Sequence, residues 1–282
     1  MIIDLHVHTI YSDGEKSPLE ILKMCNDNSI STVAITDHGN ILGAKKAIKE
    51  NPYPNIKIIP GIELTAIYSK KGCNLHILGY NIDLENKELN NLSNAIMEDA
   101  ERRVKSFIEQ LKICYNISFQ QKDIDEIFNS VGNIGRPDVA KLCVKYGYAK
   151  TVHEAFKKLL DPLEDKVEKR RVRPTAKDCI EYIQNAGGIA CLAHPIELKK
   201  DMDELKEYIA ELKGYGLKAV EVYQSKHTKE YSRQLLEIVN ELGLLYSVGS
   251  DYHGPIVSPD IEIGSGKENN LNISNVSILN NL

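Results

Sequence analysis

Short runs of β-branched and other apolar residues alternate with longer segments of helical periodicity along much of the chain. Such alternation is typical of βα units and a parallel sheet. Seven of the short runs are predicted to be strands: Ile2–His8, Thr32–Thr36, Lys57–Leu64, Leu75–Tyr80, Ile189–Ala193, Ala219–Gln224 and Leu245–Gly249. The pattern therefore predicts an α/β fold built on a parallel sheet.

Capping residues predict where several of the intervening helices begin and end. Ser17 followed by Pro18 is typical of an N-cap with proline at the first helical position. Three later helical segments are each followed by glycine, a common signal of a helix C-terminus. These segments are Thr175–Ala186, Asp203–Tyr215 and Thr228–Leu242.

The middle of the chain departs from this alternation. No strand is predicted between residues 86 and 173, whereas four segments show helical spacing of apolar residues. These are Ala95–Leu111, Asp123–Phe128, Pro137–Tyr146 and Val152–Leu160. We therefore expect residues 1–87 and 174–282 to form a βα barrel and residues 88–173 to form an all-helical insertion domain. The Asn-rich tail, Asn269–Leu282, is expected to be loosely attached.

Composition narrows the class of protein. The chain has 282 residues, of which 42% are hydrophobic and 27% charged, as in ordinary globular domains and unlike disordered or fibrous chains. A net charge of −5 provides no global basic field for a nucleic-acid duplex or an anionic membrane. Neither a signal peptide nor an apolar run of roughly 20 residues is visible. We expect a cytoplasmic protein whose six scattered cysteines are free thiols.

Metal-ligand residue types lie at or near the ends of nearly all the predicted strands. His6 and His8 are two apart on the first strand, so both rings point to one face, which Asp4 shares and where it could hydrogen-bond one of the rings. The C-terminal face of the strands is where βα barrels build active sites. Nine candidate ligands follow this pattern: His6, His8, Asp13, His38, Glu63, His76, His194, Asp251 and His253.

A single histidine of this kind is usually structural, but six of the eight histidines share the pattern. Imidazole and carboxylate together are ligands for Zn²⁺, Mn²⁺ or Fe²⁺. Nine ligands exceed what one ion takes, so we expect two or three ions, an arrangement typical of phosphate-ester hydrolysis. No nucleophile elbow, P-loop or Rossmann fingerprint competes with this interpretation.

The motifs resemble those of the polymerase and histidinol phosphatase (PHP) family. The resemblance rests on D-L-H-V-H-T-x-x-S-D-G at residues 4–14, then T-D-H, G-I-E, L-H-I-L-G-Y, A-H-P and S-D-Y-H-G, in family order. It implies a distorted (β/α)7 barrel with a trinuclear metal centre. By this resemblance His6, His8, Glu63 and Asp251 would hold one ion, Glu63 would bridge to a second held by His76 and His194, and Asp13, His38 and His253 would hold the third.

Within the family, the insertion resembles that of standalone nucleoside 3′,5′-bisphosphate phosphatases and 5′–3′ exonucleases. The segments Asn133–Pro137, Glu221–Tyr223 and Ser225–Thr228 carry this narrower match, although Asp138 stands where histidine is expected. It implies that Arg136 faces substrate phosphate and that His227 contacts phosphate or donates a proton to the leaving group. A capping arginine and a helix-start surface histidine are the alternatives. The expected catalytic residues are Glu63, Asp251 and His227.

The resemblance implies a metal-dependent phosphoesterase in which a metal-bound hydroxide attacks phosphate esters of nucleotides. Two to three Mn, Fe or Zn ions are the expected cofactors. The expected substrates are 3′,5′-bisphosphate nucleotides, mononucleotides or short, single-stranded 5′-phosphorylated oligonucleotides. No membrane or stable duplex partner is expected. A histidinol-phosphate phosphatase, an amidohydrolase and a non-catalytic PHP module are the alternative functions.

Overall fold

The computed structural model describes residues 2–67, 75–168, 172–266, 269–271, 273 and 275–282. The chain divides into two compact units, Met1–Ser93 with Arg173–Leu282, and Asn94–Val172. All seven strands belong to the first unit, and the regular secondary structure in the described residues of the second is all helical.

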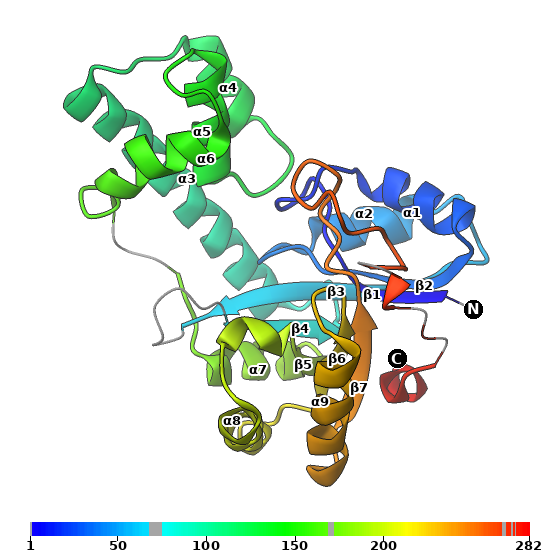
Figure 1. Ribbon diagram of the computed structural model, residues 1–282. Helices are drawn as coiled ribbons and strands as arrows, with labels where there is room; N and C mark the ends of the chain where they lie inside the picture. The colour runs from blue at the N-terminus through cyan, green and yellow to red at the C-terminus, as the bar shows by residue number, and fades with distance from the viewer. Residues whose placement is uncertain (1, 68–74, 169–171, 267–268, 272, 274) are drawn as a thin grey trace. The chain divides into compact units, whose positions relative to one another are not determined.

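The first unit is built on one seven-stranded sheet in which the strands follow chain order (Figure 1). Its ends approach each other, because His8 N donates to Tyr252 O at 3.0 Å and Asp251 N donates to His6 O at 2.9 Å. The sheet is therefore a nearly closed barrel, and the expected α/β, seven-stranded fold is confirmed. The strands are β1 (Ile2–Val7), β2 (Ile30–Ile35), β3 (Lys57–Ala66), β4 (Leu75–Tyr80), β5 (Ile189–Leu192), β6 (Ala219–Gln224) and β7 (Leu245–Gly249).

The expectation of a uniformly parallel sheet is wrong at β4, which runs antiparallel to both β3 and β5. Only eight residues, 67–74, join β3 to β4, whereas a parallel crossover needs a dozen or more. The reversal places the beginning of β4 beside the end of β3, where His76 pairs with Thr65. A histidine at the start of a strand thereby reaches the same end of the barrel as ligands at the ends of other strands.

Five of the described α-helices lie wholly in the first unit: α1 (Pro18–Asp27), α2 (Leu42–Glu50), α7 (Ala176–Asn185), α8 (Met202–Gly214) and α9 (Lys229–Glu241). Ser17 begins α1 with a capping box, in which its Oγ accepts from Glu20 N at 3.3 Å while its own N–H donates to the Glu20 carboxylate. Thr228 caps α9 in a similar way, accepting from Tyr231 N. Both helix starts match the sequence prediction within a residue.

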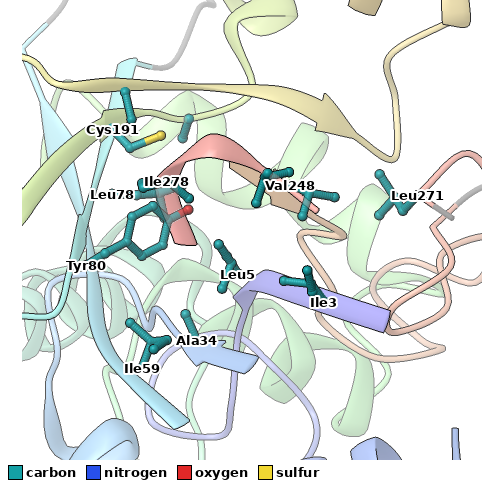
Figure 2. Close-up of a cluster of buried hydrophobic side chains, with 13 residues drawn as sticks. Ile3, Leu5, Ala34, Ile59, Leu78, Tyr80, Cys191, Val248, Leu271 and Ile278 are labelled. Atoms are coloured by element: carbon teal, nitrogen blue, oxygen red, sulfur yellow. The ribbon is translucent and has the colours of Figure 1, made fainter. Parts of the chain in front are cut away.

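The C-terminal tail packs into the barrel core, so the expectation of a loose end is wrong. Leu271, Val276 and Ile278 are fully buried among the barrel residues that include Ile3, Leu5, Ala34, Ile59, Leu78 and Val248 (Figure 2). Ser277 Oγ accepts from Tyr246 N at 2.8 Å. The scattered Ile and Leu of a largely polar tail therefore supply apolar side chains to the core.

Replacing Ile278 with alanine is expected to lower the free energy of unfolding by about 2–5 kcal/mol, because it removes buried methyl groups and leaves a cavity. Urea unfolding followed by circular dichroism measures the change. Ile256→Ala is the control, since Ile256 is 86% exposed and its loss should change stability by less than about 0.5 kcal/mol. Equal, small effects of both substitutions would show that the tail does not stabilise the barrel.

The second unit contains most of α3 (Lys87–Tyr115), then α4 (Gln121–Phe128), α5 (Arg136–Lys145) and α6 (Val152–Ala155). A π-helical turn, Phe156–Leu160, and a 3₁₀ turn, Asp161–Leu163, continue from α6. Its own core includes Val104, Phe107, Leu111, Val139 and Leu160. A helical unit between β4 and β5 thus agrees with the loss of strand periodicity in this part of the sequence.

Two further expectations concern membranes and thiols. Within the described residues, the helices are all too short or too polar to cross a bilayer. Cys25, Cys143, Cys179 and Cys191 are buried free thiols, and Cys114 is a half-buried one. Cys73 lies outside the described residues.

Candidate metal centre

The nine side chains expected to bind metal all belong to the first unit. They come from β1 and the turn after it (His6, His8, Asp13), the end of β2 (His38), β3 (Glu63), the start of β4 (His76), the end of β5 (His194) and the end of β7 (Asp251, His253). The backbone fixes several of these positions. Gly39 N donates to Glu63 O at 2.8 Å, and Glu63 N donates to Asp37 O at 3.2 Å, so the segment carrying His38 lies directly beside Glu63.

Glu63 lies at the centre of the cluster, and its side chain is fully buried. Its two carboxylate oxygens face different groups of rings. Oε2 lies 3.2 Å from His6 Nε2, 3.1 Å from His8 Nε2 and 3.1 Å from His38 Nδ1. Oε1 lies 2.9 Å from His76 Nδ1 and 3.0 Å from His194 Nε2. One carboxylate thus connects five imidazoles, as a bridging ligand would.

The described residues contain three groups of potential metal ligands, and within each group the ligand atoms lie within 4.8 Å of one another. The first contains all four residues expected for one ion: His6, His8, Glu63 and Asp251. The second contains the three expected for another, Asp13, His38 and His253, together with His8. The third contains His38, Glu63 and His76. His194, expected to accompany His76, has its Nε2 3.2 Å from His76 Nδ1.

The charges in the cluster fit a cation site. Burial lowers the pKa of His8, but the carboxylates of Asp251 and Glu63 outweigh burial and raise the pKa to about 10. Burial raises the pKa of Glu63, yet the surrounding histidines hold that pKa well below its usual range. Carboxylates that stay charged in a buried site require nearby positive charge. The donor set of imidazole and carboxylate suits Zn²⁺, Mn²⁺ or Fe²⁺, which would supply that charge in place of protons.

Glu221 on β6 supports two of the candidate ligands, a role the sequence analysis missed. Its side chain is fully buried, with Oε1 2.9 Å from His6 Nδ1, and Oε2 accepts from His194 N at 2.7 Å. The hydrogen bond that Asp4 could have made to one of the rings does not form. The Asp4 carboxylate instead accepts from the backbone N–H groups of His6, Ser250 and Gly264. The sequence did contain a signal for the role of Glu221, because this acidic residue lies between Val220 and Val222 in a buried strand.

Gly249 on β7 lies so close to His6 on β1 and to the Glu221 side chain that no larger residue fits. A Cβ at Gly249 would lie 2.2 Å from His6 Cβ and 2.7 Å from Glu221 Oε1, so only glycine fits there. Asp251, two residues later, has a positive φ of 59°, and His194 has a φ of 24°. Such conformations are unfavourable for residues with side chains and are common at functional sites.

Asp37 fixes the turn that carries Asp13. Its buried carboxylate accepts from Thr9 N at 2.7 Å, Thr9 Oγ1 at 2.8 Å and Ser12 Oγ at 2.7 Å. Asp13 itself is about half exposed, with an oxygen 3.3 Å from His253 Nε2. This side of the cluster is therefore accessible to solvent.

His227 is buried, so the alternative of a surface histidine at a helix start is wrong. Its Nδ1 lies 2.9 Å from Val222 O, to which a protonated Nδ1 would donate. Nε2 is buried without a hydrogen-bond partner among the described atoms. Burial lowers the pKa of His227 to about 4, which favours a neutral ring at pH 7.

Arg136 lies in the second unit, at the start of α5, in contact with two carboxylates. It donates to Asp161 at 2.5 Å and to Glu164 at 3.0 Å, and its guanidinium lies 4.8 Å from the centre of the Phe156 ring. Asp138, which stands where histidine is expected, accepts from Gly135 N at 2.9 Å and so caps the same helix.

Comparisons with known proteins point to one family. The family model described as the PHP domain matches residues 4–173. The chain is 29% identical to the 5′-3′ exoribonuclease Rnm of Salmonella typhimurium, covering 94% of this chain and 88% of that protein. It is 25% identical to the 3′,5′-nucleoside bisphosphate phosphatase of Chromobacterium violaceum, covering 90% and 87%.

A solved structure shares the fold. An amidohydrolase from Chromobacterium violaceum superimposes with a TM-score of 0.75 at 24% identity, covering 90% of this chain and 88% of that one. Because the family model matches more than half of the chain, and the motifs it includes supply most of the ligand cluster around Glu63, the chain belongs to the PHP domain family.

Proposed function

We propose that this protein is a metal-dependent phosphoesterase that hydrolyses phosphate esters of nucleotides. The observation that carries the proposal is the cluster around Glu63, where five imidazoles meet one buried carboxylate and two further carboxylates lie nearby. The similarity to a 5′-3′ exoribonuclease and a 3′,5′-nucleoside bisphosphate phosphatase, each along most of the chain, supports a nucleotide substrate.

We propose two to three ions of Mn, Fe or Zn in the cluster, with Glu63 shared between two of them. When bound, such ions stabilise charge on a phosphate ester and lower the pKa of a water molecule. The chain's own residues hold the ligands in place. Glu221 orients His6 and the backbone of His194, and Asp37 fixes the turn before Asp13. All nine ligands fall outside residues 88–173, in keeping with a catalytic barrel and a separate insertion domain.

Mononucleotides, 3′,5′-bisphosphate nucleotides and short single-stranded 5′-phosphorylated oligonucleotides are the proposed substrates. Binding to a duplex draws on many phosphate contacts from a basic surface, and the net charge of −5 does not favour such a surface.

The function is tested by phosphate or nucleotide release from these substrates, from histidinol phosphate and from a blunt duplex, each with Mn²⁺ and with a chelator. Release from histidinol phosphate alone would favour a histidinol-phosphate phosphatase, and no release would favour a non-catalytic module.

His227 is proposed to contact the phosphate or the leaving group of the substrate. A buried ring nitrogen without a hydrogen-bond partner supports this role, because such a group is costly unless something pairs with it. With Nδ1 protonated towards Val222 O, the neutral ring offers Nε2 as an acceptor, which suits a substrate hydroxyl group or a protonated phosphate oxygen.

Arg136 is proposed to bind substrate phosphate with its guanidinium group. Arg136→Ala is then expected to lower kcat/KM by roughly 10–100-fold, the effect of one charge-assisted contact of about 1.5–3 kcal/mol. Arg136→Lys should restore little, because an ammonium group cannot form two parallel hydrogen bonds.

The contacts of Arg136 with Asp161 and Glu164 define the competing structural role. Steady-state kinetics and thermal unfolding of the same variants separate the two. A lower Tm with unchanged kcat/KM would show that Arg136 only stabilises the helical unit. Arg233→Ala is the control, since Arg233 also contacts two carboxylates but lies on the exposed face of α9.

A further inference from the structure

Lys226 lies in the turn after β6, beside the ligand cluster. Its Nζ is 2.7 Å from Glu197 Oε1 and 4.0 Å from Asp251 Oδ2. Glu197 belongs to the short 3₁₀ turn Pro195–Leu198, and its other oxygen lies 3.5 Å from His194 Nδ1. Lys226 therefore lies close to one candidate ligand, Asp251, and pairs with Glu197, which contacts a second one, His194. Lysine itself is not a usual metal ligand.

The backbone around Lys226 is held firmly. Asn270 Nδ2 donates to the carbonyl oxygens of Gln224, Ser225 and His227 at 3.0, 2.8 and 3.2 Å. Lys226 N donates to Gln224 Oε1 at 2.7 Å, and Ser225 Oγ donates to Ser250 O at 2.6 Å. By contrast the side chain of Lys226 is 48% exposed. A fixed backbone thus presents a solvent-accessible ammonium group at the edge of the cluster.

We propose that Lys226 binds the phosphate group of the substrate, exchanging its contact with Glu197 for a phosphate oxygen. The inference rests on the proposed phosphoesterase function for its ligand. Glu197 is 25% exposed, and a partly exposed ion pair contributes little net stability, so the exchange costs little. Phosphate carries more charge than a carboxylate and offers several acceptor oxygens to the same ammonium group. The 4.0 Å separation from Asp251 places a phosphate bound to Lys226 next to the ligand cluster.

A purely structural role is the rival explanation. Lys226 could neutralise Glu197 and so keep His194 in place. In that case Lys226→Gln and Glu197→Gln would both disturb His194 and lower metal content. If Lys226 instead binds phosphate, the two substitutions act in opposite directions, because Glu197 competes with phosphate for the same ammonium group.

The test is calorimetric titration of the full-length, Mn²⁺-loaded protein with inorganic phosphate. Lys226→Gln is expected to weaken phosphate binding by about tenfold or more, with metal content equal to that of the unmodified protein. Glu197→Gln is expected to strengthen phosphate binding, and the double variant should bind as weakly as Lys226→Gln. Lys206→Gln is the matched control, because Lys206 is 45% exposed and pairs with Glu241 on α9, away from the cluster.

Phosphate binding by Lys226→Gln within twofold of the unmodified protein would overturn the inference. Loss of metal in that variant, or equal weakening by Glu197→Gln, would favour the structural role and overturn it as well. The titration requires no turnover. If the unmodified protein binds phosphate through Lys226 but releases none from any substrate, the proposed function fails and the binding role of Lys226 stands.

Discussion

Glu63→Gln is expected to abolish most activity and to lower metal content. Each oxygen of Glu63 faces imidazole nitrogens, three on one side and two on the other. Glutamine keeps one acceptor oxygen and turns an NH₂ donor towards the other group of rings, while one negative charge is lost from a buried site. We expect the fall in kcat/KM to exceed the roughly 10–100-fold loss typical of residues that only support a metal ligand.

Metal analysis and steady-state kinetics on the same preparations check this result. Glu230→Gln is the control, since Glu230 lies on the surface of α9 and pairs with Arg233. It should keep its metal and its activity. A Glu63→Gln variant with normal metal content and normal kcat/KM would show that Glu63 bridges nothing.

Glu221→Gln is expected to weaken metal binding by roughly 10–100-fold, although Glu221 is not one of the nine candidate ligands. Its two oxygens accept from two different groups, the His6 ring and the His194 backbone. Glutamine can accept only on one side, so one of the two ligands loses its support or faces a second donor. Because the site is fully buried, water cannot easily replace the lost contact.

Competition between the protein and a metal-binding dye measures the affinity of each variant. Glu211→Gln on the exposed surface of α8, where Glu211 accepts from Tyr215 Oη, serves as the control. Unchanged metal affinity in Glu221→Gln, with the fold intact by circular dichroism, would mean that His6 and His194 need no support from β6.

Local patterns in the sequence were sufficient to predict the seven strands and the candidate ligands at or near their ends. β4, β6 and β7 have the predicted bounds, because short β-branched runs ended by turn residues carry a strong signal. The closeness of the candidate ligands can be predicted from the strands, because a barrel brings strand ends together whatever their separation in the chain. Glu63 and His194, 131 residues apart, meet for this reason.

The features that were missed leave no periodic or capping signal in the sequence, and several depend on contacts between distant segments. The direction of β4 follows from the length of its connection to β3, which periodicity does not report. The burial of Ile278 depends on residues of several strands, which come together only when the sheet has formed. α2 begins without a side-chain cap at Ile41, so no capping residue marked it. The roles of Glu221 and Glu197 depend on the residues they contact, His6, His194 and Lys226, and these contacts exist only in the folded chain.

The metal stoichiometry of the unmodified protein is the direct test of a multi-metal centre. The protein would be stripped of metal, reconstituted with Mn²⁺, Fe²⁺ or Zn²⁺, freed of unbound ions and analysed by elemental mass spectrometry. The nine ligand-type side chains of the cluster, Glu63 among them, predict two to three equivalents per chain. Less than one equivalent with every one of these metals would contradict a multi-metal centre, and with it the proposed basis of phosphate-ester hydrolysis.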